Sequence, residues 1–438
     1  MTTQKVMNRW WVVVGGILVQ LCLGSIYAWS AFTGKLTAAS GPFQFTKTQT
    51  QVIFSVGLLS FAIVMALVDG NWQKKVGPRI VALTGGLVLG LGYVLGGLVG
   101  NSFWGILLGI GVLGGAGIGL GYVCPIAALV KWFPDKKGMI TGLAVAGFGF
   151  GALLWIKLTS GFKFGSIDLT KGWTGLYGMG WTVSQVWILY GVLFAVIVGL
   201  GSIVLVNPPD GWKPEGWSPP SGATASSTGG VEFAPNQMAR TAQFWKLFLT
   251  FFVGATAGLM VIGVIQLFGK DALTANGIPA ERADIITGTA MGLFFALLNG
   301  LGRIIWGTLS DKMGRKAAIA TMTGLQGLMM IVFYFIGGRE LGLYFGAAII
   351  GFNFGGNFAL FPAATADYFG NKSVGINYPW VFMAYGVGGV VGPVLGGVMG
   401  DAKAWMWAFV PAGVACLVMA AVALTLCPPA PLKEPKQA

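Results

Sequence analysis

One arginine stands inside a long apolar segment. Arg303 lies in the run ALLNGLGRIIWG, with apolar neighbours on both sides. A cation at membrane depth costs about 3 kcal/mol on insertion scales, so its presence indicates a cavity, a partner or a function. Asn299 precedes it by about one helical turn and therefore shares its helix face. Because a guanidinium matches a carboxylate in two parallel hydrogen bonds, this pair predicts a site for a small carboxylate anion, with Asn299 as a further donor.

Two other roles would also explain Arg303. Asp311 follows it by about 12 Å of helix, so the arginine side chain could extend to the lipid headgroups at the helix end. It could instead form an ion pair with Asp69 or Asp311. Both roles predict that the guanidinium is occupied and has no opening beside it.

Aromatic residues are the candidates for the wall of a carboxylate site. A buried tyrosine hydroxyl should find a partner, which favours Tyr122 and Tyr385 as lining residues. For the other candidates, ordinary helix packing or an aromatic belt at the membrane interface is the simpler interpretation. These others are Tyr27, Phe148, Phe354 and Phe358.

The composition excludes most other chemistry. Charged residues make up 9% of the chain, whereas a soluble domain has about a quarter. There is no histidine, and the four cysteines are far apart, so we expect no cofactor, metal site or disulfide framework. The net charge of +13 is spread over short connectors, which argues against a nucleic-acid partner. We do not expect a membrane enzyme, which would need paired carboxylates or a metal cluster. Nor do we expect a channel, which would need charged rings or filter carbonyls.

Twelve apolar segments are long enough to cross a membrane. A spanning helix needs about 20 apolar residues, and the 72 glycines allow such helices to pack closely. The first segment is longer than a signal-peptide core and has no clear cleavage site, so we expect an uncleaved first helix. The predicted spans are 10–34, 48–69, 80–100, 104–130, 139–160, 185–206, 245–268, 283–306, 317–337, 341–365, 374–399 and 405–426.

The basic residues orient these spans. With the N-terminus in the cytoplasm, seventeen of the 27 lysines and arginines fall on the cytoplasmic side and nine, including Lys157, on the outer side. The one that remains is Arg303, inside a span. Because cytoplasmic loops carry an excess of Lys and Arg, we expect a multi-pass protein of the cell (inner) membrane, surrounded by the lipid bilayer, with both termini cytoplasmic.

Landmarks of the first half of the chain recur 237 residues later. The matching pairs are Gly70–Arg79 with Gly307–Lys316, Pro125 with Pro362, and Gly149 and Gly151 with Gly386 and Gly388. The same offset takes Asn299 and Arg303 to Ala62 and Ala66, so the polar pair is present in one half only. Duplicated halves place a binding site at their interface near the bilayer midplane, and transport then proceeds by rocking one half against the other.

A segment rich in Pro, Gly, Ser and Thr separates the two halves and predicts a flexible linker. We therefore expect an N-terminal six-helix bundle at 1–206, a cytoplasmic linker at 207–240 and a C-terminal six-helix bundle at 241–438. The predicted fold is an all-α integral membrane protein with twelve transmembrane helices in two pseudo-symmetric six-helix bundles.

The connector after the eighth span carries a charged motif. It reads G-x-x-x-D-K-x-G-R-K over Gly307–Lys316, whereas the first copy has Lys74 in place of the acid. The acid can face the positive ends of neighbouring helices while the basic residues lie near anionic headgroups, as a gating support or simply as an orientation signal. This motif resembles the signature of the major facilitator superfamily, which implies the fold predicted above. The motif residues that we single out are Asp311, Lys312, Gly314 and Arg315.

A second resemblance is narrower. Residues 121–152, GYVCPIAALVKWFPDKKGMITGLAVAGFGFGA, resemble the oxalate/formate antiporter family and the related monocarboxylate transporters. This resemblance implies that the arginine of span 8, here Arg303, binds the substrate carboxylate. Oxalate carriers of the family pair it with a lysine in span 11, where this chain has Tyr385. One positive charge suits one carboxylate, so we predict a secondary active transporter of small monocarboxylates such as lactate or pyruvate.

The residues leave the coupling of transport open. The chain has no histidine and no clear mid-span carboxylate, so an obvious proton relay is missing. The expected partners are a small carboxylate anion and either protons or a counter-anion. The monocarboxylate resemblance favours proton-linked symport, and an oxalate/formate-type anion exchanger is the alternative.

Overall fold

The computed structural model describes residues 7–133, 137–161, 163–164, 167–168, 174–209, 212–214, 232–370 and 373–429. Within them, twelve helical segments are long and apolar enough to cross a membrane, and most begin and end within a few residues of the predicted spans. They are Arg9–Leu36, Lys47–Leu67, Pro78–Leu98, Phe103–Leu129, Gly142–Ser160, Val183–Ile203, Ala242–Ala275, Ala280–Met313, Arg315–Ile336, Glu340–Phe369, Ile376–Asp401 and Met406–Ala423.

The first six spans form one half of the molecule, together with a short hairpin that the sequence did not predict. Three segments depart from α geometry: η1 is a 3-10 helix, and η2 and η3 are π-helical. The elements are α1 (Arg9–Leu23), η1 (Gly24–Ala28), α2 (Ser30–Leu36), α3 (Lys47–Val64), η2 (Met65–Asp69), α4 (Gly70–Val76), α5 (Pro78–Leu98), α6 (Phe103–Ile106), η3 (Leu107–Gly114), α7 (Gly115–Gly121), α8 (Val123–Trp132), α9 (Lys137–Ser160), β1 (Lys163–Phe164), β2 (Ile167–Asp168), α10 (Gly175–Gly178) and α11 (Val183–Ile203).

The last six spans form the other half. One span contains a π-helical segment, η4, between two α-helical parts. The elements are α12 (Pro235–Met238), α13 (Ala242–Ala275), α14 (Ala280–Thr289), η4 (Ala290–Phe295), α15 (Ala296–Met313), α16 (Arg315–Ile336), α17 (Glu340–Phe369), α18 (Val374–Asp401) and α19 (Met406–Ala423).

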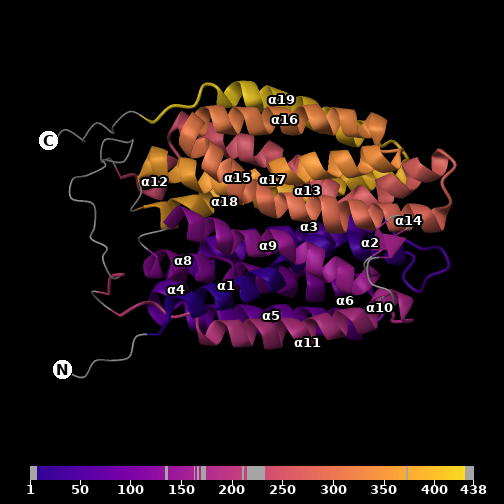
Figure 1. The fold of residues 1–438 in the computed structure, drawn as a ribbon, viewed down its shortest axis with the longest axis horizontal. Coiled ribbons are helices and arrows are strands. Elements are labelled where there is room, and N and C mark those ends of the chain that lie inside the picture. Colours follow the sequence, from indigo (N-terminus) through magenta and orange to yellow (C-terminus); the bar gives the residue numbers. More distant parts are fainter. Residues whose placement is uncertain are drawn as a thin grey trace.

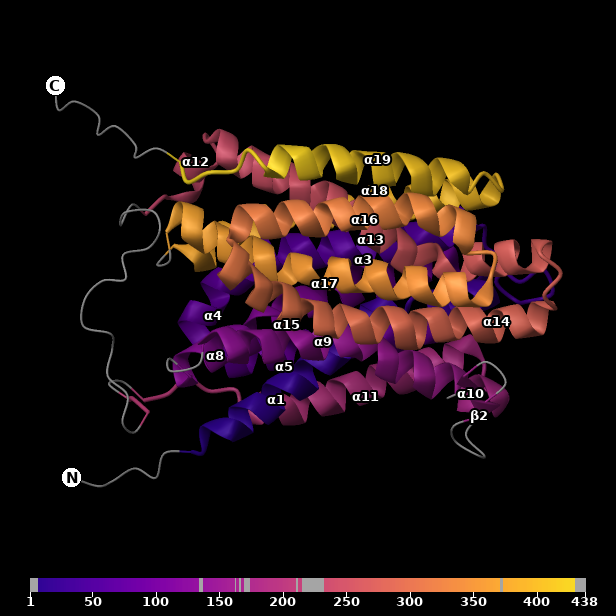
Figure 2. The same ribbon diagram turned by 45° about the horizontal axis from the view of Figure 1, so that its top comes forward.

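The two halves lie side by side with their helices nearly parallel to the long axis of the molecule (Figures 1 and 2). The described chain begins and ends at the same end of the bundle, which also carries α4, α8 and α12; we call this end the termini side. The opposite end, with α10 and the start of α14, is the distal side. Most of the predicted linker, at 210–211 and 215–231, lies outside the described residues, as do residues 134–136 within the segment 121–152. The boundaries at 206 and 240 therefore stay predictions.

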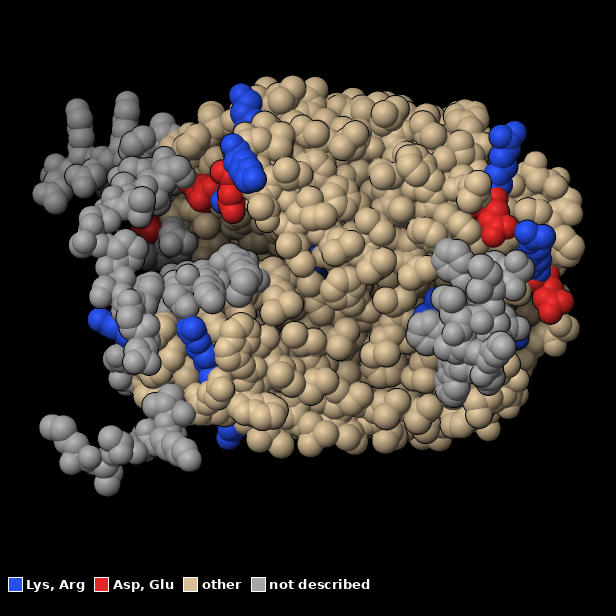
Figure 3. All heavy atoms as spheres, viewed as in Figure 1, with Lys and Arg blue, Asp and Glu red and all other residues tan. Residues whose placement is uncertain are grey.

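Charged side chains gather at the two ends of the molecule and leave a mostly uncharged belt between them (Figure 3). Many large apolar side chains in the middle of the helices are exposed, among them Leu87, Val196 and Leu328. A surface of this kind is stable in contact with lipid rather than water. The termini side is hollowed between the two halves (Figure 3).

The internal repeat is visible in the geometry of matching glycines. Gly77 and Gly314, 237 residues apart, have φ angles of 81° and 85° and precede α5 and α16. Only glycine adopts this left-handed conformation without steric cost. Across the interface, a Cβ on Gly386 of α18 would lie 2.4 Å from the Cβ of Ala62, so this small residue lets the halves approach closely. Gly149 of α9, its counterpart, makes the matching approach to α15, where a Cβ would lie 3.0 Å from the Cα of Gly300.

Candidate anion-binding site

Arg303 is buried between the two halves of the molecule. Its side chain projects from α15 and the residue is 1% exposed. The Nη1 atom donates to the backbone carbonyl of Val145 in α9, at 2.9 Å, and the Nε atom donates to Oδ1 of Asn299, at 3.4 Å. The predicted shared face of Asn299 and Arg303 is therefore confirmed, and the guanidinium bridges the second half to the first.

Two aromatic rings flank the guanidinium. Its Cζ atom lies 4.1 Å from the ring centre of Phe358 and 5.5 Å from that of Phe148. Phe358 belongs to α17 and Phe148 to α9, so each half contributes one ring. Cation–π contacts of this kind reach about 2 kcal/mol when desolvated, which offsets part of the cost of holding a cation at membrane depth.

The structure does not match the two other roles considered for Arg303, extension to the lipid headgroups and an ion pair with an acidic residue. The guanidinium is buried rather than extended to the end of the helix, and it makes no ion pair within the part of the chain that the structure describes. Asp311 instead pairs with Arg315, at 2.7 Å. The side chain of Asp69 lies outside the described residues.

One buried donor on each residue of the Arg303–Asn299 pair has no partner in hydrogen-bond geometry among the described residues. These donors are Nη2 of Arg303 and Nδ2 of Asn299, and both residues are almost completely buried. A buried polar atom without a partner costs about 1–3 kcal/mol, and more when it is charged. A ligand with two acceptor oxygens would remove both penalties at once, as a carboxylate does.

The six predicted aromatic residues all lie in one buried cluster around Arg303. The hydroxyls of Tyr27 and Tyr385, one from each half, are 3.1 Å apart. The ring centre of Tyr27 lies 5.1 Å from that of Phe148 and 5.7 Å from that of Phe354. The remaining contacts are Tyr122 to Phe148 at 5.2 Å, Tyr385 to Phe358 at 5.5 Å and Phe354 to Phe358 at 5.4 Å. The structure thus brings together Tyr122 and Tyr385, which the sequence favoured as lining residues, and the four aromatic residues for which it favoured ordinary packing.

Local breaks in two helices place the tyrosines in this cluster. Pro125 has no N–H to donate to the preceding turn, so the span that contains it breaks between α7 and α8, at Tyr122. The side chain of Gln20 donates to the backbone carbonyl of Tyr122 at this break, at 2.8 Å. Tyr27 lies in the 3-10 segment η1, whose Gly24 packs so closely on α9 that a Cβ would be 2.1 Å from the carbonyl oxygen of Phe148.

Sequence reasoning missed further rings of the cluster, two of which come from opposite halves. Phe61 of α3 and Phe382 of α18 meet across the interface with ring centres 5.4 Å apart. Phe382 also stacks on Tyr385, at 4.7 Å, and Phe61 lies 5.2 Å from Tyr122. Their spacing gave a signal, because Phe382 precedes Tyr385 by one helical turn and therefore shares its face.

Within the charged motif, Arg315 forms ion pairs. It donates to Asp311 of α15 and to Asp367 of α17, at 2.7 and 2.8 Å, and also to Ser310. It therefore ties three helices together on the termini side. Its expected position near lipid headgroups stays a prediction. Lys312 is exposed, as expected of a headgroup contact, and Gly314 supplies the sharp turn between α15 and α16.

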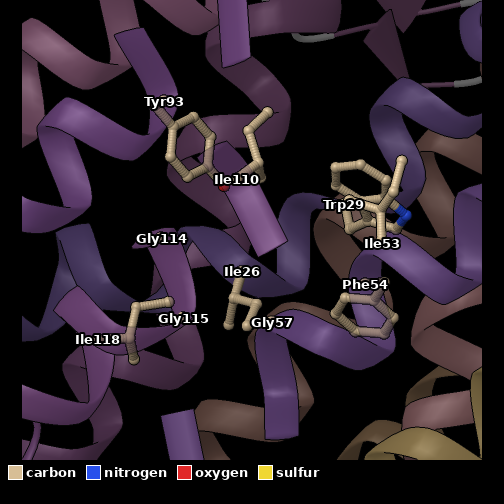
Figure 4. A pocket seen from close by; sticks show the side chains of 10 residues that line it. All are labelled: Ile26, Trp29, Ile53, Phe54, Gly57, Tyr93, Ile110, Gly114, Gly115 and Ile118. Carbon is tan, nitrogen blue, oxygen red and sulfur yellow. The ribbon is translucent and has the colours of Figure 1, made fainter. Parts of the chain in front are cut away.

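A separate pocket lies within the first half and has a different character. No charged residue lines it, and none of the candidate site residues does (Figure 4). An apolar lining of this kind does not suit an anion. The lining residues are Ile26, Trp29, Ile53, Phe54, Gly57, Tyr93, Ile110, Gly114, Gly115 and Ile118.

Comparison with known proteins decides the family. The model of the Major Facilitator Superfamily matches residues 13–375 and 283–438. The chain belongs to this superfamily. It is accordingly a multi-pass membrane transporter, and the family predicted from the motif of Gly307–Lys316 is confirmed.

Individual relatives in the superfamily support the narrower resemblance. The chain is 26% identical to the oxalate:formate antiporter of Oxalobacter formigenes over 428 residues, which cover 96% of this chain and 92% of that protein. It is 26% identical to apicoplast pyruvate carrier 1 of Toxoplasma gondii, over 87% of this chain and 82% of the carrier. A solved bacterial homologue of the human lysosomal transporter Spinster has the same fold, with a TM-score of 0.64, 17% identity, and coverage of 95% and 96%.

Proposed function

We propose that this transporter carries small monocarboxylates of the lactate and pyruvate kind by alternating access, from a central site around Arg303. The observation that supports it best is the pair of orphan donors, Arg303 Nη2 and Asn299 Nδ2, buried inside an aromatic cluster that both halves build. A carboxylate would accept from both donors, and the rings would enclose its short carbon chain. We place the termini side in the cytoplasm and the distal side outside, following the distribution of basic residues.

The charge of the cluster favours one carboxylate over two. Arg303 is the one cation among the described side chains that contact the aromatic cluster. A dicarboxylate such as oxalate would bring a second negative charge into a site where Tyr385 offers only a hydroxyl. Burying that charge without a partner is costly, which is why we put monocarboxylates first and an oxalate/formate-type exchanger second.

Purified protein in liposomes separates the candidate functions. Saturable uptake of labelled lactate or pyruvate that accelerates when the outside is acidified would support proton-linked symport. Uptake only into vesicles preloaded with an anion would support exchange, the activity named for the Oxalobacter relative. Absence of uptake for every short-chain acid would contradict both.

Replacing Tyr385 by lysine tests the charge argument. We expect Tyr385→Lys to shift the ratio of oxalate to lactate affinity at least tenfold towards oxalate, because a second buried cation can pair with the second carboxylate. Competition of each acid against labelled lactate measures the ratio. Tyr385→Phe is the matched control: it removes the hydroxyl contact with Tyr27 but adds no charge, so it should leave the preference where it was. An equal change in both variants would contradict the argument.

Polar contacts close the distal side between the halves. Nζ of Lys47 in α3 lies 2.6 Å from Oδ2 of Asp271 in α13, which also accepts from Trp405 Nε1, at 3.0 Å. Asp401 of α18 accepts from the backbone N–H groups of Lys47 and Thr48, at 2.8 and 2.9 Å. A carboxylate at a helix N-terminus is stabilised by the helix dipole. These contacts must break before a substrate can reach the central site from the distal side.

We expect Asp401→Ala to open the distal side more often. The substitution removes the contacts of Asp401 with Lys47 and Thr48. Even one surface contact of this type is worth about 1 kcal/mol, which corresponds to a roughly fivefold change in the equilibrium. A cysteine at the buried position Gln51, in a Cys427→Ser background, reports the opening through its rate of labelling by an impermeant maleimide added outside. Lys270→Ala is the control, because its ion pair with Asp284 stays within one half. Equal labelling rates in Asp401→Ala and the parent would contradict the expectation.

A further inference from the structure

Lys157 is a second buried basic residue within a membrane span. It lies near the distal end of α9, within the span Gly142–Ser160, and is 5% exposed. The count of basic residues assigns it to the outer side. The structure shows in addition that it is buried, so that two buried cations, Lys157 and Arg303, lie among the residues that it describes within spans.

Both cations lie along one seam between the halves. The seam joins α9 to the span that contains η4 and α15. From the termini side outward, Val145 accepts from Arg303, and Gly149 packs on Gly300. Further out, the seam continues to Gly292 of η4, where an added Cβ would lie 2.9 Å from Ile156 and 3.4 Å from Cε of Lys157.

The spacing along α9 sets the distance between the two cations. Lys157 follows Val145, the residue that holds Arg303, by about 18 Å of helix. It therefore stands between the central site and the distal rim, where Lys47 is already paired with Asp271. Gly292 leaves room for the lysine stem, and the π-helical turn that carries it is a feature that often marks functional positions.

We propose that Lys157 is an outer anion-binding residue on the transport path, which receives a carboxylate from the distal side before it reaches Arg303. The proposal rests on the proposed function. Lys157 is engaged within the protein in the closed arrangement, so separation of the halves on the distal side is the step that exposes its ammonium to the anion. An ammonium on a flexible stem suits this role, because it binds a carboxylate as a point charge and releases it without the geometric demands of a guanidinium fork.

Transport from the two sides of the membrane tests the role. We expect Lys157→Gln to raise the KM for labelled lactate about five- to tenfold from the distal side and to flatten its dependence on ionic strength. The KM from the termini side should stay unchanged. Lys157→Arg should retain most of the wild-type affinity because it keeps the charge. Lys270→Gln, which removes an exposed lysine near the distal rim, is the matched control for a general change in surface charge.

The outcomes of this experiment distinguish an anion-binding role of Lys157 from a structural one. Equal KM changes from both sides, or a loss of Vmax alone, would identify Lys157 as a structural anchor and overturn the proposal. Lys157→Met guards against a folding defect peculiar to glutamine, and failure of both neutral variants to reach wild-type folded yield would also overturn it. Wild-type protein that carries no monocarboxylate would instead contradict the proposed function, whatever the Lys157 variants do.

Discussion

Arg303→Ala should reduce lactate and pyruvate uptake at least 100-fold while the folded protein is retained. The substitution removes the charge and the fork that would hold the substrate carboxylate, and charge-assisted bonds of this kind are worth about 3 kcal/mol or more in a desolvated site. Folding should suffer little, because the substitution also removes the cost of burying a cation at membrane depth. Uptake into liposomes and thermal unfolding in detergent measure the two effects separately.

Two milder variants show which property of Arg303 matters. Arg303→Lys keeps the charge but loses the planar fork and the hydrogen bond to the carbonyl of Val145, so its uptake should lie between alanine and wild type. Asn299→Ala removes one of the two orphan donors, and we expect about a tenfold rise in KM. Near-normal uptake by the alanine variant of Arg303 would contradict the proposal that Arg303 binds the substrate carboxylate.

The spans were predictable because the membrane imposes a length and an apolar composition on each of them. The ends were less predictable where a helix continues past the apolar core. The span predicted at 245–268 runs from Ala242 to Ala275, and its added distal turns carry the charged residues Lys270 and Asp271, which hydropathy reads as loop. The β1–β2 hairpin was not predicted, since two residues per strand leave no alternating pattern to detect.

The site was predictable where burial of a polar group is expensive. Arg303 and Asn299 could be found because a cation and an amide in an apolar run require a reason. The carbonyl of Val145 could not, because every residue has one and only tertiary packing brings this one to the guanidinium. The burial of Lys157 could not be predicted for a related reason: near the end of an apolar run, the sequence does not say whether a lysine reaches water or faces another helix.

The close approach of α15 and α17 supports the whole central site. A Cβ on Gly355 of α17 would lie 2.1 Å from the backbone oxygen of Asn299 and 2.9 Å from its Oδ1. One turn earlier in α17, the carbonyl of Phe352 would lie 2.0 Å from a Cβ on Gly302. Backbone atoms cannot yield as the tip of a flexible side chain can, so any larger residue at these glycines must push the two helices apart.

We therefore expect Gly355→Val to lose most of its folded protein, because overpacking against backbone costs about 1–3 kcal/mol or more. Gly355→Ala should fold in part and lose uptake at least tenfold, since the displaced Asn299 no longer holds its donor beside Arg303. Gly307→Ala is the matched control within α15, because its added methyl meets only the Cβ of Ala359, at 3.5 Å. Uptake and unfolding temperature of the alanine variants, compared in the same detergent, measure both effects. If Gly355→Ala matched Gly307→Ala in both uptake and unfolding temperature, the contact between α15 and α17 would not be what positions the site.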